Sequence, residues 1–246
     1  MLLGIMSDVH ANELALDACL AALESHAVDR LVFLGDIVGY GPDPEAVTQR
    51  VADLASQGAI CLMGNHDAAA LGQKSSMHDV AAAAIAWTAP RLSESSRRFL
   101  STLPMKAVLE DAFFVHADAS KPEGWIYVLD ALAAMQSIMA VPQRVTFCGH
   151  VHRPRLYCLT ATAKVIAHTP VTDSTVPLSP QRHWLAVAGS VGQPRDGNPA
   201  ASFLTYDTAS RDLTYRRASY DYEATAQRIR DAGLPEQLAQ RLSSGT

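Results

Sequence analysis

The stretch LLGIMSDVH, residues 2–10, indicates the class of fold. Its first five residues are apolar, which is typical of a strand buried on both faces of a sheet, and the polar residues Asp8 and His10 follow almost immediately. The same order, an apolar run and then a polar cluster, recurs four more times before residue 153. The other apolar runs are 30–34, 59–63, 112–115 and 144–147.

Helical patterns separate the first three of these runs. Residues 12–27 carry leucines at helical spacing after Asn12, a residue type favoured as a helix cap, and residues 43–57 repeat the pattern before Gly58. Strand–helix–strand units of this kind predict an α/β protein.

The remaining chain shows three different sequence patterns. Residues 72–104 are alanine-rich and helical without a clear strand, which predicts a helical insertion beside the core. After Arg155, short strands alternate with turn residues, and we expect a second, largely antiparallel sheet followed by C-terminal helices over about 156–246. Because 48% of the 246 residues are hydrophobic, the chain can bury one sizeable core, and we predict a single domain, residues 1–246.

The composition limits the classes of function and the cellular compartment that we expect. A formal net charge of −5 disfavours a binder of long nucleic acid and is compatible with a small phosphorylated substrate. The four cysteines form no Cys-X-X-Cys pair, so we expect buried free thiols and a reducing, cytoplasmic location. Neither a signal peptide nor a membrane span is expected, and no pattern indicates an oligomeric state.

The five polar clusters occupy equivalent positions, immediately after predicted strands. They supply eight candidate site residues: Asp8, His10, Asp36, Asn65, His66, His116, His150 and His152. Because strand ends of an α/β sheet converge at its carboxyl edge, these side chains can surround one small volume. Glycines 35, 64 and 149 let the chain turn sharply there.

The donor types indicate a metal site. Imidazole, carboxylate and amide groups without thiolates suit Mn or Fe, or Zn in a hydrolytic role, and seven candidate ligands suit two metals that share a carboxylate. Each cluster alone is compatible with an ordinary buried histidine or a turn. Five such clusters in order would require five independent coincidences.

The series Asp-X-His, Gly-Asp, Gly-Asn-His-Asp, a lone His and Gly-His-X-His over residues 8–152 resembles the calcineurin-like metallophosphoesterases. The resemblance implies a four-layer α/β/β/α sandwich of two mixed β-sheets flanked by helices. It also implies two sets of metal ligands that share Asp36 as a bridge. The first set is Asp8, His10, Asp36 and His152, and the second is Asp36, Asn65, His116 and His150.

The implied reaction is phosphate ester hydrolysis. Two cations about 3.5–4 Å apart lower the pKa of a bridging water, so that hydroxide attacks phosphorus in line, and they neutralise charge on the phosphoryl oxygens. His66 matches no ligand, so we expect it to stabilise the transition state or protonate the leaving oxygen. A purely structural His66 is the alternative.

One departure from the family concerns GDIVGYGPDP, residues 35–44. The protein phosphatases of the superfamily have a second Asp and an Arg where this chain has Gly39 and Tyr40. An Asp–His dyad is therefore in doubt, although Asp67 is a candidate to orient His66 if it does not simply form a turn. This motif, with GSVGQPRDG at 189–197, resembles a bacterial branch of phosphoesterases or diadenosine tetraphosphate hydrolases.

Candidate substrate contacts are Asn65, Tyr40 and Arg195. Arg195 presents a planar guanidinium group for phosphate, unless it is merely solvated. The aromatic residues Tyr40, Trp87, Trp125 and Tyr127 can stack a base, although packing is the commoner role of an aromatic residue.

The leading hypothesis is a phosphodiesterase or phosphatase acting on a small, nucleotide-like substrate. Its competitors are a dinucleoside polyphosphate hydrolase, a deoxyribonuclease and, from another class, a non-catalytic partner-binding scaffold, which would be expected to lose metal ligands.

Overall fold

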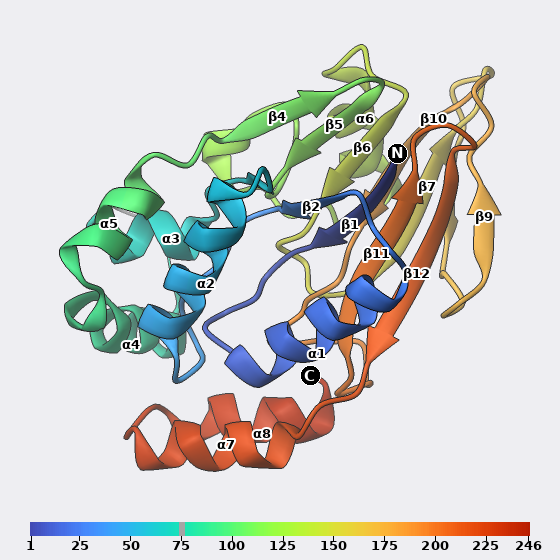
Figure 1. The fold of residues 1–246 in the computed structure, drawn as a ribbon. Helices are drawn as coiled ribbons and strands as arrows, with labels where there is room; N and C mark the ends of the chain where they lie inside the picture. The colour runs from blue at the N-terminus through green and yellow to red at the C-terminus, as the bar shows by residue number, and fades with distance from the viewer. Residues whose placement is uncertain (74–76) are drawn as a thin grey trace.

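Two six-stranded mixed sheets form the centre of the protein. A computed structural model describes residues 1–73 and 77–246, and Figure 1 shows the sheets with helices on their outer sides. The strand orders are β3-β2-β1-β11-β12-β9 and β4-β5-β6-β10-β7-β8. The predicted fold class is confirmed.

The first sheet has a parallel half and an antiparallel half. β1 (Leu2–Met6), β2 (Arg30–Phe33) and β3 (Ile60–Cys61) are parallel neighbours. On the other side of β1, the strands β11 (Ala201–Asp207), β12 (Asp212–Ala218) and β9 (Thr175–Pro177) follow in antiparallel pairs.

The second sheet repeats this design. Its parallel strands are β5 (Ala112–Val115), β6 (Val145–Cys148) and β10 (His183–Val187). Antiparallel strands extend both sides: β4 (Lys106–Leu109), β7 (Arg155–Leu159) and β8 (Val165–His168).

The strands after Arg155 do not form a sheet of their own, so that part of the prediction is wrong. β7, β8 and β10 extend the sheet of β5 and β6, whereas β9, β11 and β12 extend the sheet of β1. The physical reason is that β1 and β6 each expose a free edge whose backbone groups need partners. A strand pattern predicts that a segment is extended, and it does not say which edge will receive it.

Apolar side chains fill the space between the sheets. Leu3 and Ile5 from one sheet meet Phe114 and Phe147 from the other, and the two phenyl rings stack with centroids 5.4 Å apart. Burial of these apolar side chains is the main favourable term in folding, and it keeps the carboxyl ends of the parallel strands of the two sheets next to each other.

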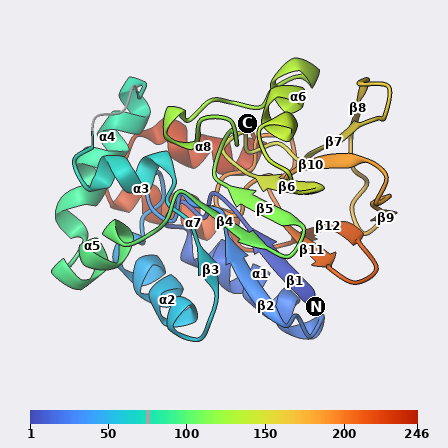
Figure 2. The ribbon, with the colours of Figure 1, turned by 90° about the horizontal axis from the view of Figure 1, so that it is seen from above.

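Helices cover both outer faces. α1 (Glu13–Ser25), capped by Asn12, and α2 (Pro44–Ser56) pack on the first sheet, and α6 (Ala131–Met139) packs on the second. Figure 2 shows α6 on the side of β6, opposite α1 and α2. α1 and α2 correspond to the two predicted helices.

The predicted helical insertion is present in the described residues. It contains α4 (Asp79–Thr88), a 3-10 turn at Ala89–Arg91 and α5 (Glu94–Ser101), after the short α3 (Asn65–Ala70). Residues 74–76 of the predicted insertion lie outside the described residues. A second 3-10 turn lies at Pro122–Gly124.

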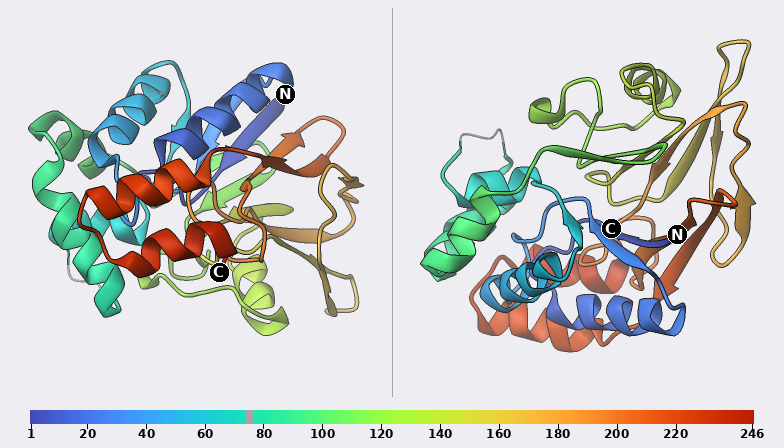
Figure 3. Two further views of the ribbon diagram at one scale, coloured as in Figure 1. Left: turned by 90° about the horizontal axis from the view of Figure 1, so that it is seen from below. Right: turned by 45° about the horizontal axis from the view of Figure 1, so that its top comes forward.

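The C-terminal helices also follow the prediction. α7 (Tyr222–Asp231) and α8 (Glu236–Ser244) are separated at Gly233, which has a φ of 71°. They lie side by side next to α1 (Figure 3) and pack with α4 around Tyr40. All four cysteines are free and buried, as predicted.

Among the helices of the described residues, none has the length and apolar character required to cross a membrane.

Candidate active site

The loops that follow β1, β2, β3, β5 and β6 meet where the two sheets end. Backbone hydrogen bonds tie these loops together, from His10 N to Asp36 O (2.9 Å) and from Gly149 N to His116 O (2.8 Å). All eight predicted site residues are therefore brought together, and none of them is more than 7% exposed.

All three predicted glycines are required by close packing in this region, and a Cβ at Gly35 would overlap the backbone of Gly64. A Cβ at Gly64 would overlap Asp36 Oδ1, and a Cβ at Gly149 would overlap the side chains of Ser7 and Asp8. The absence of a side chain at these positions therefore lets the loops pack against the carboxylates.

Strained backbone accompanies this packing. Five of the site residues are in the left-handed region, which costs a non-glycine residue about 1–3 kcal/mol. They are Asp8, His10, Asp36, His150 and His152, with φ between 51° and 66°. Strain of this kind persists only where the surroundings enforce it, and it is concentrated here at the candidate ligands.

A first group of possible ligand atoms comes from Asp8, His10 and His152. His10 Nε2 lies 3.1 Å from His152 Nε2, and Asp8 Oδ1 lies 3.2 Å from His152 Nε2. Asp8 Oδ1 is buried without a hydrogen-bond partner among the described residues, while Oδ2 accepts from His150 N at 2.9 Å.

A second group contains Asp36, His116 and His150. His116 Nε2 lies 3.3 Å from Asp36 Oδ2, 3.2 Å from His150 Nδ1 and 3.2 Å from Asn65 Oδ1. Asp36 Oδ2 is also 3.7 Å from His10 Nε2 of the first group. Asp36 therefore lies between the two groups, as a bridging carboxylate would.

Backbone carbonyl groups orient the imidazoles of the four candidate histidine ligands, His10, His116, His150 and His152. A carbonyl oxygen can only accept, so the ring nitrogen facing it carries a hydrogen, and the inward nitrogen presents a lone pair when the imidazole is neutral. This arrangement is typical of metal-ligating histidines. The pairs are His10 Nδ1 with Val38 O (3.1 Å), His116 Nδ1 with Leu34 O (3.0 Å), His152 Nδ1 with Gln193 O (2.7 Å) and His150 Nε2 with Trp125 O (3.0 Å).

The electrostatics also favour a cation. Burial opposes ionisation of Asp36, but His116 and His66 lower its pKa well below the usual range. Burial likewise disfavours a charged His116, yet the Asp36 and Asp8 carboxylates raise its pKa to about 9. The two carboxylates therefore attract positive charge strongly.

The other imidazoles are held neutral. Burial, followed by the charge of His66, lowers the pKa of His10 well below its usual value. Burial also lowers the pKa of His150 to about 3, and burial with the charge of Arg195 lowers that of His152. Neutral imidazole is the form that binds metals, so these residues fit two cations on chemical grounds.

His66 lies beside both groups. One of its ring nitrogens is within 4.8 Å of ligand atoms of His10 and Asp36, and its Nδ1 is buried without a hydrogen-bond partner among the described residues. Asp67 does not orient it, because the Asp67 carboxylate accepts from Gly64 N (2.9 Å) and Val38 N (3.1 Å). Asp67 thus has the turn-forming role.

Gly39 closes one side of the His66 ring. A Cβ at Gly39, whose φ is 88°, would overlap His66 Nδ1. The backbone at this position therefore packs directly on the ring of His66.

The candidate substrate contacts border the same volume. The Tyr40 ring contacts the rings of both His10 and His66, with centroid distances of 4.5 and 4.4 Å. The Arg195 guanidinium carbon is 5.6 Å from the centre of the Tyr40 ring. Asn65 already faces His116 through its Oδ1.

Sequence reasoning missed the groups that support the imidazoles. Val38, Leu34, Gln193 and Trp125 act through backbone carbonyls, which leave no signal in the side-chain pattern. The sequence does not indicate the partner of Tyr127, whose ring packs on His150 with centroids 3.9 Å apart and an interplanar angle of 19°.

Comparisons with known proteins identify the family of the chain. Residues 1–211 match the Calcineurin-like phosphoesterase superfamily domain. The chain therefore belongs to this superfamily, and membership indicates phosphoesterase hydrolase activity. The buried histidine and aspartate groups are consistent with the dinuclear metal site typical of the family.

Three relatives match the chain over nearly its whole length. The crystal structure of a metallophosphoesterase from Sphaerobacter thermophilus is 36% identical, with a TM-score of 0.88, over 100% of this chain and 99% of the other. An uncharacterized protein of Methanocaldococcus jannaschii is 29% identical over 99% of this chain and 98% of its own. A hypothetical protein from Pyrococcus horikoshii is 18% identical, with a TM-score of 0.82, over 100% and 98%, and shows the shared fold.

Proposed function

We propose that the protein is a dinuclear metal-dependent phosphoesterase that hydrolyses a phosphate ester of a small, nucleotide-like substrate. The observation that carries this proposal is the convergence of four imidazoles, at His10, His116, His150 and His152, whose inward nitrogens gather around the buried carboxylates of Asp8 and Asp36. Acceptor atoms this close together repel one another unless a cation lies among them.

The proposed ligands are divided between two metals. Asp8, His10, His152 and Asp36 would hold one, and Asp36 with the residues of the second group and Asn65 would hold the other. Imidazole, carboxylate and amide donors without a thiolate favour Mn or Fe, with Zn as a further possibility. When bound, the metals supply an acidified water and positive charge for the phosphoryl oxygens.

His66 assists the leaving group in this proposal. Burial lowers its pKa to about 4, so the imidazole of the free protein is neutral at pH 7. Its N–H can donate a hydrogen bond to the leaving oxygen, where negative charge develops. The nearby Tyr40 ring excludes water from one side of His66, because Tyr40 is only 6% exposed.

Arg195 is the proposed phosphate contact from the protein. Its guanidinium lies over Tyr40, and its buried Nε has no hydrogen-bond partner among the described residues. An unpaired guanidinium N–H next to a metal centre is available for a phosphoryl oxygen.

Turnover of two model esters tests the proposal. The manganese-loaded protein is assayed with bis(p-nitrophenyl) phosphate and p-nitrophenyl phosphate, beside His66→Ala and the chelator-treated protein. We expect diester turnover that both treatments abolish or strongly reduce. If neither ester is hydrolysed although two metals are bound per chain, an anhydride substrate or a partner-binding role replaces the ester hydrolase.

A further inference from the structure

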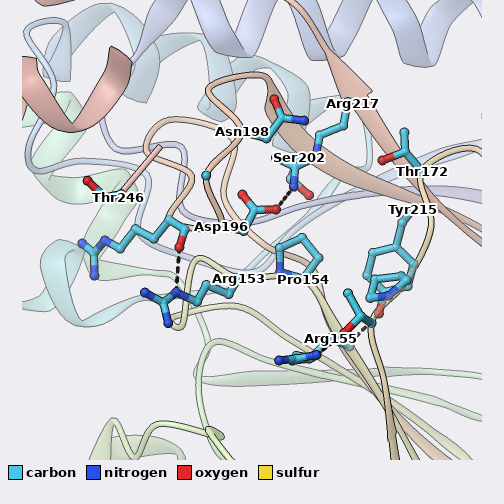
Figure 4. Close-up of a pocket in the computed structure, with 14 residues that line it drawn as sticks. Arg153, Pro154, Arg155, Thr172, Asp196, Asn198, Ser202, Tyr215, Arg217 and Thr246 are labelled. Atoms are coloured by element: carbon cyan, nitrogen blue, oxygen red, sulfur yellow. Dashed lines mark hydrogen bonds and ion pairs between the residues drawn. The ribbon is translucent and has the colours of Figure 1, made fainter. Parts of the chain in front are cut away.

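A polar cavity lies beside the proposed metal centre. It has a volume of about 660 Å³ and is formed by the segment after His152, by residues 195–198 and by β12. Figure 4 shows Arg153, Arg155 and Arg217 around it. A cavity of this volume is within the range that accommodates a small molecule.

Positive charge dominates the side chains that line this arginine-lined pocket. Four of them are arginines, at 153, 155, 195 and 217, and one is an aspartate, Asp196. Asp196 is already paired with Arg217. The other three guanidinium groups have no carboxylate within 4 Å in the described part of the chain, in a protein whose net charge is −5.

Hydrogen bonds to the surrounding chain hold the arginines in place. Arg153 Nε donates to Arg195 O (2.6 Å), Arg217 donates to Ala200 O (2.8 Å), and Arg155 donates to Thr169 Oγ1. Each bond uses only part of a guanidinium fork, so the remaining N–H groups are positioned and free for a ligand.

We propose that the arginine-lined pocket is a binding site for a phosphorylated small molecule with more than one phosphate group. Planar guanidinium forks match phosphate oxygens in pairs, and such charge-assisted hydrogen bonds are about twice as strong as neutral ones. A ligand with two or more anionic groups matches the three arginines that have no carboxylate partner in the described part of the chain.

Arg195 connects the pocket to the metal centre. Its backbone N–H donates to His152 O at 3.0 Å, and its guanidinium carbon lies 5.6 Å from the Tyr40 ring centre. The ligand is therefore either the distal phosphates of a long substrate or a separate phosphorylated effector. The binding site itself does not depend on the proposed hydrolysis.

Calorimetric titration with inorganic tripolyphosphate tests the site. The titration uses chelator-treated protein, so that binding at the metals does not contribute, and circular dichroism verifies the fold. Arg153→Gln/Arg155→Gln removes two exposed pocket arginines, and Arg50→Gln/Arg98→Gln removes two exposed arginines from α2 and α5 as a control of equal charge.

We expect one tripolyphosphate per chain in the wild type and the control, and affinity weaker by about tenfold or more in the pocket variant. Absence of binding to the wild type, or equal weakening in both double variants, would overturn the proposal. Because this titration needs neither metal nor turnover, a failure of the proposed hydrolysis leaves its result unaffected.

Kinetics with manganese in excess then identify the source of the phosphates. If they belong to the substrate, the pocket variant loses about tenfold in kcat/KM for diadenosine tetraphosphate and retains its turnover of bis(p-nitrophenyl) phosphate. If they belong to an effector, tripolyphosphate alters diester turnover in the wild type and the control but not in the pocket variant. Either result supports the site.

Discussion

The proposed metal centre and the arginine-lined pocket are adjacent along the chain, since His152 belongs to one and Arg153 to the other, yet they are opposite in character. The proposed metal centre is buried and rich in acceptors, with the Asp8 and Asp36 carboxylates ionised and the His10, His150 and His152 imidazoles neutral. The pocket is open and rich in donors. A phosphate group is repelled by the first until cations are added, whereas the second attracts it directly.

The two sites also differ in how their side chains are fixed in position. Packed loops, strained backbone and carbonyl contacts fix the metal centre. The pocket relies on long side chains, two of them exposed. The metal centre should therefore respond sharply to single substitutions, and the pocket should respond to charge and salt.

The largest effect is expected from Asp36→Asn, which keeps the shape of the shared ligand but removes its charge. We expect metal content to fall from two per chain to one or fewer, and diester turnover to fall by more than about 10³-fold. Elemental analysis and the ester assay measure both. Asp53→Asn on the exposed face of α2 is the control, and two metals retained in Asp36→Asn would argue against a bridging role.

His66→Ala separates catalysis from metal binding. We expect kcat to fall by about 10²- to 10⁴-fold with two metals still bound, because the variant removes a hydrogen-bond donor to the leaving oxygen and no ligand. His78→Ala, at an exposed helix cap, is the matched control. Activity within twofold of the wild type would leave His66 with a structural role only.

Salt distinguishes the two sites. Raising ionic strength from about 0.05 M to about 0.5 M should weaken tripolyphosphate binding in the pocket by about tenfold, because exposed charges are screened. Manganese retention should change little, since buried pairs are screened much less. Calorimetry and elemental analysis at both salt concentrations provide the comparison; equal sensitivity of the two sites would remove the distinction drawn between them.

The smallest expected effect is at Tyr127, which is 46% exposed and stacks on His150. Losing an aromatic contact of about 0.5–1.5 kcal/mol should weaken manganese binding at the second group by about fivefold in Tyr127→Ala. Tyr127→Phe retains the ring and should bind like the wild type. The two manganese dissociation constants decide whether the ring or the hydroxyl matters.

The sequence predicts that the candidate ligands come together, because these side chains directly follow apolar runs. Asp8 follows β1 and Asp36 follows β2, so an ordinary strand pattern places both at one edge. The fold class, the helical segments within residues 72–104 and the C-terminal helices are also predictable from the sequence, because each has a clear hydrophobic periodicity.

Other features leave no local signal. The choice of sheet edge for β10 and β11 depends on distant partners, and β4 was missed because its residues are exposed or only partly buried. The arginine-lined pocket draws on positions 153, 155, 195 and 217, and only the folded chain brings them together.

The most direct test of the central claim is anomalous X-ray diffraction from crystals of the manganese-loaded protein. The account predicts two manganese peaks, one among Asp8, His10 and His152, the other among Asn65, His116 and His150, with Asp36 contacting both. A single peak, or two peaks without a contact to Asp36, would contradict it.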